Sequence, residues 1–467
     1  MRRVPLLLCP LILVACVAVP PNLGTEGDVP PGDHTEALVG FDGKTNGFVD
    51  QATFDEDRVV FEDVETVSDG LGPLYNAQSC RECHQNPVTG GISQVSELRA
   101  GSRDASGRFH NARVPIARGT VYIEGRTLIN ERAICPSAAF PNDEIQEHVP
   151  DDANITTFRM SLNVLGDGLV EAMSDESLRA LAARQCRDTN GRICGRTIEV
   201  PILEASGING VGRFGWKAQQ ASLLSFSADA YLNEMGITNR LLRDEVTTIC
   251  DTVPDPEDRP ASEAIGQRVQ RRAQAGVPRA RAAPDFADID RFARFIRATK
   301  APPRDNILAN TDAARKGSGV FDSIGCATCH VRTLTTAPAG TKVNGDTFTI
   351  PEALGRKTFY PFSDFLLHNL GTGDGIVVPM QEHYGRNMYQ ITWKNFSPDN
   401  FQAAQNKIRT APLWGVRLRN RLMHDGASVT PRDAILRHSG EARDVSHRFE
   451  RLSHSDQEAI LDFLGSL

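Results

Sequence analysis

The distribution of apolar residues along the chain predicts mostly helices. Apolar residues at the three- and four-residue spacing of one helix face are clearest at Phe286, Ile289, Phe292, Phe295 and Ile296. Comparable patterns predict helices at residues 174–184, 218–235, 286–297, 312–324, 430–437 and 455–467. Short strands, such as one at residues 120–124, are expected among the loops of the first half. The predicted fold class is mainly α.

Local signals mark where some of these helices begin and end. Ser174 is suited to cap the helix at 174–184, and Ser455 with Glu458 has the pattern of a capping box. The prolines at 302–303 end the helix at 286–297, because proline has no N–H to donate to the helix. We therefore place a boundary there, between a first domain at residues 46–303 and a second at 304–467.

The N-terminal segment has the pattern of an export signal. Arg2 and Arg3 precede a short apolar stretch at residues 4–14, which is too short to span a bilayer. The following Ala-Cys, with Cys16, is typical of a bacterial lipoprotein cleavage site; a plain secretory signal is the alternative. Either way we expect the chain on the periplasmic side of a bacterial membrane, anchored in the first case by lipid at Cys16. Residues 17–45, rich in Pro, Gly, Asp and Thr, are expected to be a flexible tether.

Two short motifs carry the chemistry. The runs Cys80-Arg-Glu-Cys83-His84 and Cys326-Ala-Thr-Cys329-His330 both have the spacing of a c-type haem attachment site. The two thiols form thioethers to the haem vinyl groups, and the histidine becomes the proximal iron ligand. With 10 Cys and 11 His in 467 residues, random placement gives only ~0.005 such runs. A redox dithiol or half a zinc site is the alternative, but we predict two covalently attached haem c groups.

Composition and charge change this picture little. The chain is 40% hydrophobic and 24% charged, as expected of a globular protein, and its formal net charge is −8. A negative balance argues against nucleic acid as a partner and against a polybasic membrane-binding face. The membrane contact that we expect is therefore the N-terminal lipid anchor alone.

The remaining cysteines predict disulfides. Two of the ten cysteines lie in the signal segment and four in the motifs, which leaves Cys135, Cys186, Cys194 and Cys250. An even remainder in an exported protein favours two disulfides. Cys186 and Cys194 flank a turn-forming run, Asp-Thr-Asn-Gly, and are the favoured pair, which leaves Cys135 with Cys250. Free buried thiols are the alternative.

Several runs resemble those of a known family. They are Gly-Pro-Leu-Tyr-Asn at 72–76, Gly-Leu-Val-Glu-Ala at 168–172, Gly-Arg-Phe-Gly-Trp-Lys-Ala at 212–218, Asp-Phe-Leu-Leu-His-Asn-Leu-Gly at 364–371 and the segment 424–442. Together they resemble the bacterial di-haem cytochrome c peroxidase superfamily, over about residues 40–467, and most of all its di-haem oxidoreductase branch, labelled peroxidase or thiol oxidoreductase. The resemblance implies two cytochrome c-like haem domains. Relatives often hold calcium between them, but no calcium loop is visible here, and the motifs leave no Cys-x-x-Cys for thiol chemistry.

The resemblance also implies how the irons are held. Where the superfamily places Met or Tyr on the second haem, this chain has His438, which predicts that His330 and His438 both bind that iron. The alternative for His438 is a surface histidine at a helix C-terminus. Its rival is His368, whose sequence context would instead place it at a haem edge or a propionate. We expect His424 to hold its turn or a propionate. No histidine follows His84 at the family spacing, so the first haem is predicted to be open.

Two further residues are candidates for roles beside the haems. Glu171 lies in an apolar run, where an acid is costly unless it has a partner or a task. It either moves protons over the open haem or is a structural acid bonded to an amide or an arginine. Trp216 either relays electrons between the haems or is a buried core residue.

The sequence thus predicts an exported di-haem c-type oxidoreductase of peroxidase type. Its first haem would be open to hydrogen peroxide or dioxygen, and its second would be six-coordinate and receive electrons from a small redox protein. Two alternatives remain: an oxygenase that cleaves an organic substrate with dioxygen, and a di-haem electron carrier without enzymatic activity.

Overall fold

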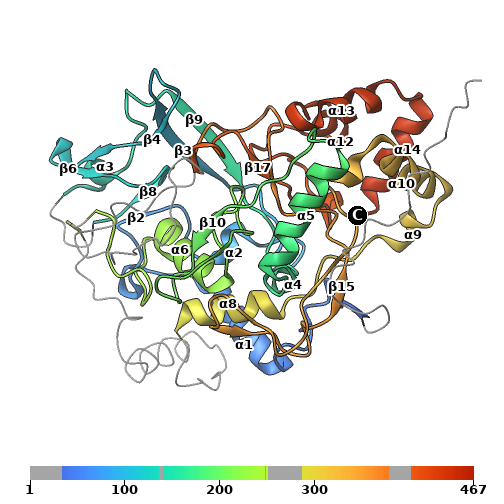
Figure 1. Ribbon diagram of the computed structural model, residues 1–467. Helices are drawn as coiled ribbons and strands as arrows, with labels where there is room; N and C mark the ends of the chain where they lie inside the picture. Colours follow the sequence, from blue (N-terminus) through green and yellow to red (C-terminus); the bar gives the residue numbers. More distant parts are fainter. Residues whose placement is uncertain (1–33, 136–139, 248, 251–286, 378–400) are drawn as a thin grey trace, which may run out of the picture.

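A computed structural model describes residues 34–135, 140–247, 249–250, 287–377 and 401–467 (Figure 1). The predicted signal segment at 1–16 and residues 17–33 of the predicted tether lie outside these ranges. The longer helices are α1 Gln51–Glu62, α5 Asp175–Asp188, α6 Leu223–Met235, α8 Asp288–Ala298, α10 Asp312–Ile324, α13 Arg443–Glu450 and α14 His454–Gly465. The shorter ones are α2 Cys80–Cys83, α3 Asn142–Ile145, α4 Asp167–Glu171, α9 Asn306–Ala309 and α12 Pro431–Leu436. Within the described ranges, none of the helices has both the length and the apolar character needed to span a membrane.

Strands occur throughout the chain, which corrects the prediction of a mainly helical fold. They are β1 Thr35–Glu36, β2 Leu74–Tyr75, β3 Ser96–Arg103, β4 Phe109–Asn111, β5 Val114–Ile116, β6 Val121–Ile123, β7 Leu128–Ile129, β8 Arg132–Ala133, β9 Ile155–Met160, β10 Glu199–Pro201, β11 Asn209–Val211, β12 Leu334–Thr335, β13 Lys342–Val343, β14 Phe348–Thr349, β15 Lys357–Phe359, β16 Leu367–His368 and β17 Ile408–Arg409. β3 pairs antiparallel with β4, β7 and β9, and Leu98 lies opposite Phe158. The fold mixes helix and strand, because this sheet joins segments far apart in sequence that a local pattern cannot pair.

The predicted helices are present, but two of them begin elsewhere. The helix expected from residue 218 begins at Leu223, where Ser222 caps it. Ser174 caps α5 as expected, and its side chain accepts a hydrogen bond from the Ser177 N–H. The last helix, α14, is capped by Ser453 rather than by Ser455: the Ser453 side chain accepts from the Asp456 N–H. Both serines precede an apolar run with an acid three residues later, so the local pattern could not separate them.

Aromatic rings join α1 and α8 along the base of the molecule (Figure 1). The sequence pattern did not predict α1 as a helix, yet its Phe54 stacks on Phe295 of α8 with ring centroids 5.2 Å apart. Phe292 of α8 also meets Tyr231 of α6, with ring centroids 5.2 Å apart. The predicted apolar face of residues 286–297 is therefore the centre of the largest core cluster.

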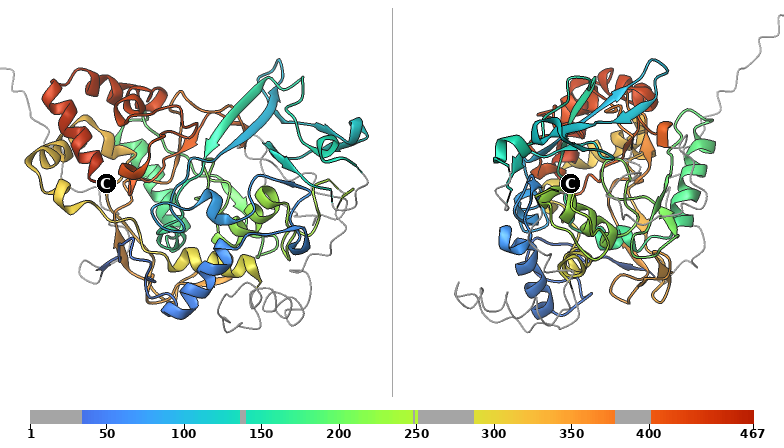
Figure 2. Two further views of the ribbon diagram at one scale, coloured as in Figure 1. Left: turned by 180° about the vertical axis from the view of Figure 1, so that it is seen from behind. Right: turned by 90° about the vertical axis from the view of Figure 1, so that its left-hand side faces the viewer.

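The helix before the second motif packs against the C-terminal helix. α10 and α14 approach so closely that a Cβ at Gly317 would collide with the backbone of Ala459. Phe321 and Phe463 meet edge-on across this contact, with centroids 5.3 Å apart. These helices lie together with α12 and α13 at one side of the molecule, and β3, β4 and β9 lie at the opposite side (Figures 1 and 2). One helix therefore leads into the second motif, and the C-terminal helix packs across it.

The two predicted domains share one core. The largest cluster of buried apolar residues includes Phe295 and Val170 from before residue 303 and Phe359, Phe365 and Trp414 from after it. The predicted tether is also wrong from residue 34 onward, because Thr35 and Glu36 form β1, which pairs in parallel with Lys357 and Thr358 of β15. The N-terminal segment is therefore built into the second half, and the division at 303 remains a prediction.

Candidate functional site

The four remaining cysteines pair as the count predicted. Disulfides join Cys135 to Cys250 and Cys186 to Cys194. Over the described part of the chain, the cysteines outside disulfides are those of the two Cys-x-x-Cys-His motifs: Cys80, Cys83, Cys326 and Cys329. The motif thiols are therefore left available for thioether bonds.

The second motif is positioned by the end of α10. Gly325 ends the helix with φ +99°, a left-handed backbone conformation that favours glycine, and Cys326 begins a 3-10 turn directly after it. The His330 N–H then donates to the Cys326 carbonyl at 3.0 Å. This tight turn holds both thiols and the imidazole together, which thioether attachment and iron ligation at one haem both require.

His330 and His438 form a facing pair. Their ring centroids are 6.4 Å apart. Two imidazoles on opposite sides of one metal ion, each with a metal–nitrogen bond of about 2 Å, place their centroids roughly 6.5 Å apart. The Nδ1 atoms are bonded to backbone carbonyls, His330 to Phe362 at 3.0 Å and His438 to Ala434 at 2.7 Å. Each ring therefore keeps Nε2 for a metal, as predicted for the second iron.

The two histidines lie in a largely apolar cavity that fits a haem. Its lining includes both motif cysteines, both histidines, Trp216 and two arginines. Burial lowers the pKa of His330 to about 4, with a further contribution from His438, and burial also lowers the pKa of His438. Both rings are therefore neutral near pH 7, which is the form that ligates iron. The thiols, the paired neutral imidazoles and the apolar walls suit a covalently attached haem.

The first motif lies between the aromatic base and a group of buried acids. Its cysteines bound α2, and the ring of His84 lies 6.3 Å from that of Phe61. Burial lowers the pKa of His84 to about 4. Within the described ranges, no second histidine makes a ring contact with His84. His110, the next histidine after His84 in the chain, is instead exposed and paired with Asp104 at 2.8 Å. The two motif histidines therefore differ in their ring neighbours, and an open first haem remains a prediction.

Acids near the first motif were missed by the sequence analysis. Glu234 accepts from the Asn76 side chain at 2.8 Å and lies 3.9 Å from Arg99, which also pairs with Glu97. Burial and the neighbouring Glu97 raise the pKa of Glu234. Burial also raises the pKa of the Cys83 thiol, and the charges of Glu234 and Glu97 raise it further. Because these residues come from β2, β3 and α6, no local pattern could have grouped them.

Glu171 is held by four hydrogen bonds. Arg297 donates to its two carboxylate oxygens at 2.6 and 2.9 Å, the Leu223 N–H donates at 2.8 Å and the Asn344 side chain at 2.9 Å. Glu171 is fully buried. The arginine and the amide are the partners that a structural acid would have, which was the alternative to a proton-transferring acid.

Trp216 lies beside the second haem cavity. Its indole N–H donates to the Met160 carbonyl at 2.7 Å, and its ring meets His424 edge-on with centroids 6.2 Å apart. Both rings line the cavity, and both are buried. Burial lowers the pKa of His424. Trp216 is therefore buried, as the alternative of a core residue required, and its predicted role in relaying electrons remains a prediction.

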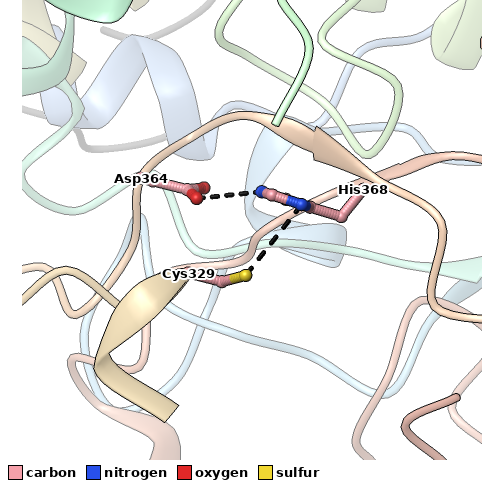
Figure 3. A group of neighbouring side chains, drawn as sticks. All are labelled: Cys329, Asp364 and His368. Atoms are coloured by element: carbon pink, nitrogen blue, oxygen red, sulfur yellow. Dashed lines mark hydrogen bonds and ion pairs between the residues drawn. The ribbon is translucent and has the colours of Figure 1, made fainter. Parts of the chain in front are cut away.

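His368 lies at the second motif, but on its sulfur side (Figure 3). Its Nε2 is 2.9 Å from Asp364 and its Nδ1 is 3.0 Å from Glu441, while the Cys329 sulfur is 3.9 Å from Nδ1. Burial opposes a charge here, but Cys329 and Asp364 raise the pKa of His368 well above its ordinary value. Since both ring nitrogens have carboxylate partners, His368 does not fit an iron ligand or a propionate partner. A position of His368 at a haem edge remains a prediction.

Ligand atoms of Cys329, Asp364 and His368 lie within 4.8 Å of one another, which is close enough to hold a metal ion. A thioether at Cys329 would remove the thiolate from this group. Gln185, which directly precedes the disulfide cysteine Cys186, supports it: its side chain donates to Asp364 and to the Thr328 carbonyl, both at 2.8 Å. The group is therefore a scaffold of the second haem motif.

A buried charge cluster joins distant parts of the chain. Asp374 pairs with Arg159 at 2.8 Å and with Lys217 at 3.4 Å, and Lys217 also donates to the carbonyls of Ala404, Gln405 and Lys407. Burial raises the pKa of Asp374, but the two cations outweigh it and lower the pKa to about 2. Lys217 lies in the run at 212–218 that the sequence singled out, beside Trp216. Its partner Asp374 had no recognisable signal.

Comparisons with known proteins identify the family. Residues 136–467 match the family described as "Di-haem oxidoreductase, putative peroxidase". Among solved structures, the chain is similar to a MauG-like protein associated with microbial copper homeostasis, at 14% identity and a TM-score of 0.35, over 94% of each chain. It is similar to a variant of the di-haem peroxidase BthA from Burkholderia thailandensis, at 16% identity and a TM-score of 0.34, over 89% of this chain and 86% of that one.

A third similar structure is hydrazine synthase from Kuenenia stuttgartiensis, at 19% identity and a TM-score of 0.23. That similarity covers 38% of this chain and 55% of the hydrazine synthase chain, so the match spans about half of that protein. No curated protein matches the chain.

Proposed function

The chain belongs to the di-haem oxidoreductase family, and on that premise we propose that it is an exported di-haem c-type peroxidase. Cys80 and Cys83 would attach the first haem, and Cys326 and Cys329 the second. His84 would be the proximal ligand of the first iron, and His330 and His438 the two ligands of the second. Bound haem supplies the redox chemistry, which is electron transfer and reduction of the oxidant.

The observation that carries this proposal is the difference between the two motif histidines. His330 has His438 at 6.4 Å, at the distance that two ligands of one iron require. His84 has Phe61, and not a second imidazole, as its ring neighbour in the described part of the chain. An iron with two protein ligands suits electron transfer, and an iron with one leaves a position for a small oxidant such as hydrogen peroxide.

The remaining roles are electron transfer between the haems, proton transfer, electron supply and membrane attachment. Trp216 lies in the second cavity wall with its indole N–H fixed on Met160, which supports a role in electron transfer toward the first haem. The contacts of Glu171 with Arg297 and Asn344 support a structural role, so we do not assign it the proton transfer. A small redox protein would supply the electrons, and a lipid at Cys16 would hold the enzyme on the periplasmic side of the membrane.

Spectroscopy on the purified full-length protein tests the proposal. We expect two haem c groups by the pyridine haemochrome assay, one high-spin and one low-spin iron, and oxidation of a reduced small cytochrome when hydrogen peroxide is added. Two low-spin irons in every redox state would instead indicate an electron carrier. High-spin iron without peroxide turnover, but with dioxygen consumption in the presence of an organic substrate, would indicate an oxygenase.

A further inference from the structure

Two arginines line the second cavity beside the histidine pair. Arg409, on β17, is 5% exposed, and its Nε donates to the Gly215 carbonyl at 2.7 Å. Arg419 follows the turn at Val416–Leu418, and its guanidinium donates to the Ser161 carbonyl at 3.0 Å. Each arginine is thus anchored by one nitrogen on a backbone carbonyl, which leaves other N–H groups for a ligand in the cavity.

Neither guanidinium has a carboxylate partner within ion-pair distance in the described part of the chain. Burial lowers the pKa of both arginines to about 10, and the charge of Arg409 adds to the lowering at Arg419. Asp167 and Asp364 act on Arg409 only from a distance. A buried and a half-buried positive charge in one cavity are costly without an anion between or beside them.

Arg419 also borders the first haem site. The Ser161 carbonyl that it binds belongs to a segment that is bonded to the loop after the first motif. In that segment the Val164 N–H donates to the Gly90 carbonyl at 2.8 Å, and the Gly90 N–H donates to the His84 carbonyl at 2.9 Å. Arg419 therefore lies between the two motifs, whereas Arg409 belongs to the second cavity.

A haem supplies the anions that this cavity lacks, because it carries two propionates on the edge opposite its thioethers. We propose that Arg409 and Arg419 bind the propionates of the second haem, and that Arg419 in addition raises the reduction potential of both haems. The effect on the potential is electrostatic. A positive charge near a haem repels the additional positive charge of the ferric iron, so it favours the ferrous iron and raises the reduction potential. The inference rests on the proposed function, since it requires haem in both sites.

Redox titration of the full-length holoprotein, followed by the absorbance of each haem, tests the assignment. Arg409→Gln should lower the midpoint potential of the second haem alone, and Arg419→Gln should lower both potentials. The matched control is Arg417→Gln, because Arg417 lies close by in sequence but donates to the carbonyls of Pro303 and Leu467 and not to the cavity. It should leave both potentials unchanged.

The outcomes separate the inference from the function on which it rests. A wild-type protein without two haem c groups would remove the proposed function itself. Two haems whose potentials are the same in Arg409→Gln, Arg419→Gln and the control would overturn the inference alone, as would an Arg419→Gln shift confined to one haem. If the Arg409→Gln variant does not retain the second haem, the Arg409→Lys variant tests the inference. Retention of the second haem in Arg409→Lys supports propionate binding by Arg409, and loss of that haem overturns it.

Discussion

The imidazoles of His330 and His438 face each other with their ring centroids 6.4 Å apart, and each is fixed through Nδ1 on a backbone carbonyl. His330 belongs to the motif after α10, and His438 follows α12. The pair is already in the arrangement of two ligands on one iron, so little reorganisation is needed on haem binding. This relationship makes the second site the better defined of the two.

Removal of His438 should open the second iron. We expect His438→Ala to convert the second haem from low-spin to high-spin, because one axial nitrogen is lost, and His438→Met to raise its potential, because Met ligation favours ferrous iron. Optical and EPR spectra of the oxidised protein measure both changes. His454→Ala is the control, since that side chain is 85% exposed. Unchanged spectra in His438→Ala would show that another residue binds this iron.

Replacement of Glu171 should cost stability more than chemistry. Glu171→Gln leaves the Arg297 guanidinium without its buried carboxylate, so we expect a loss of about 3–5 kcal/mol in the free energy of unfolding. Urea denaturation measures this loss, and Glu176→Gln, whose side chain is 82% exposed, is the control. Normal stability combined with a large loss of peroxide turnover would instead assign Glu171 to proton transfer.

Asp374 should contribute stability that acid removes. Its pKa in the folded protein is about 2, below its ordinary value of 3.8, so the unfolded chain binds the proton more readily. The contribution of roughly 2 kcal/mol is therefore fully present above about pH 4 and is lost as the pH falls toward about 2. We expect Asp374→Asn to be markedly less stable than wild type at about pH 6, with the difference shrinking in acid.

Denaturation of both proteins across that pH range checks the sign. Asp462→Asn is a suitable control, because Asp462 is exposed on α14. A difference between Asp374→Asn and wild type that does not vary with pH would mean that Asp374 does not titrate as its two cations imply.

The two disulfides should differ in how much they stabilise the fold. They join residues 8 and 115 positions apart, and loop-closure entropy predicts losses of about 2–3 and about 5 kcal/mol when each is replaced by serines. The Cys186–Cys194 disulfide also directly follows Gln185, whose side chain donates to the Thr328 carbonyl of the second motif. Its removal should therefore broaden the spectrum of the second haem as well.

Thermal unfolding and optical spectra of the two double-serine variants compare these effects directly. The Cys135–Cys250 variant serves as the control for the spectrum, because that disulfide lies in a core cluster apart from the second motif. A spectral change of equal size in both variants would contradict a specific link between the shorter disulfide and the second haem.

The sequence by itself determined the features whose chemistry is local. Thioether attachment needs two thiols and an imidazole within five consecutive residues, so Cys80 to His84 and Cys326 to His330 could be recognised without a fold. The count of remaining cysteines predicted two disulfides, and the turn-forming run between Cys186 and Cys194 indicated their pairing. The apolar spacing near Phe292 was enough to predict a core helix, because a helix face is defined by residues three and four positions apart.

The tertiary structure alone decided which distant groups meet. Asp374 finds Lys217 and Arg159, Glu171 finds Arg297, and Arg409 and Arg419 share one cavity. The same holds for the pairing of β3 with β9 that made the fold mixed rather than mainly helical. Ion pairs, ligand pairs and strand register depend on distances through space between residues far apart in the chain. Local spacing in a sequence carries no information about those distances until the core has packed.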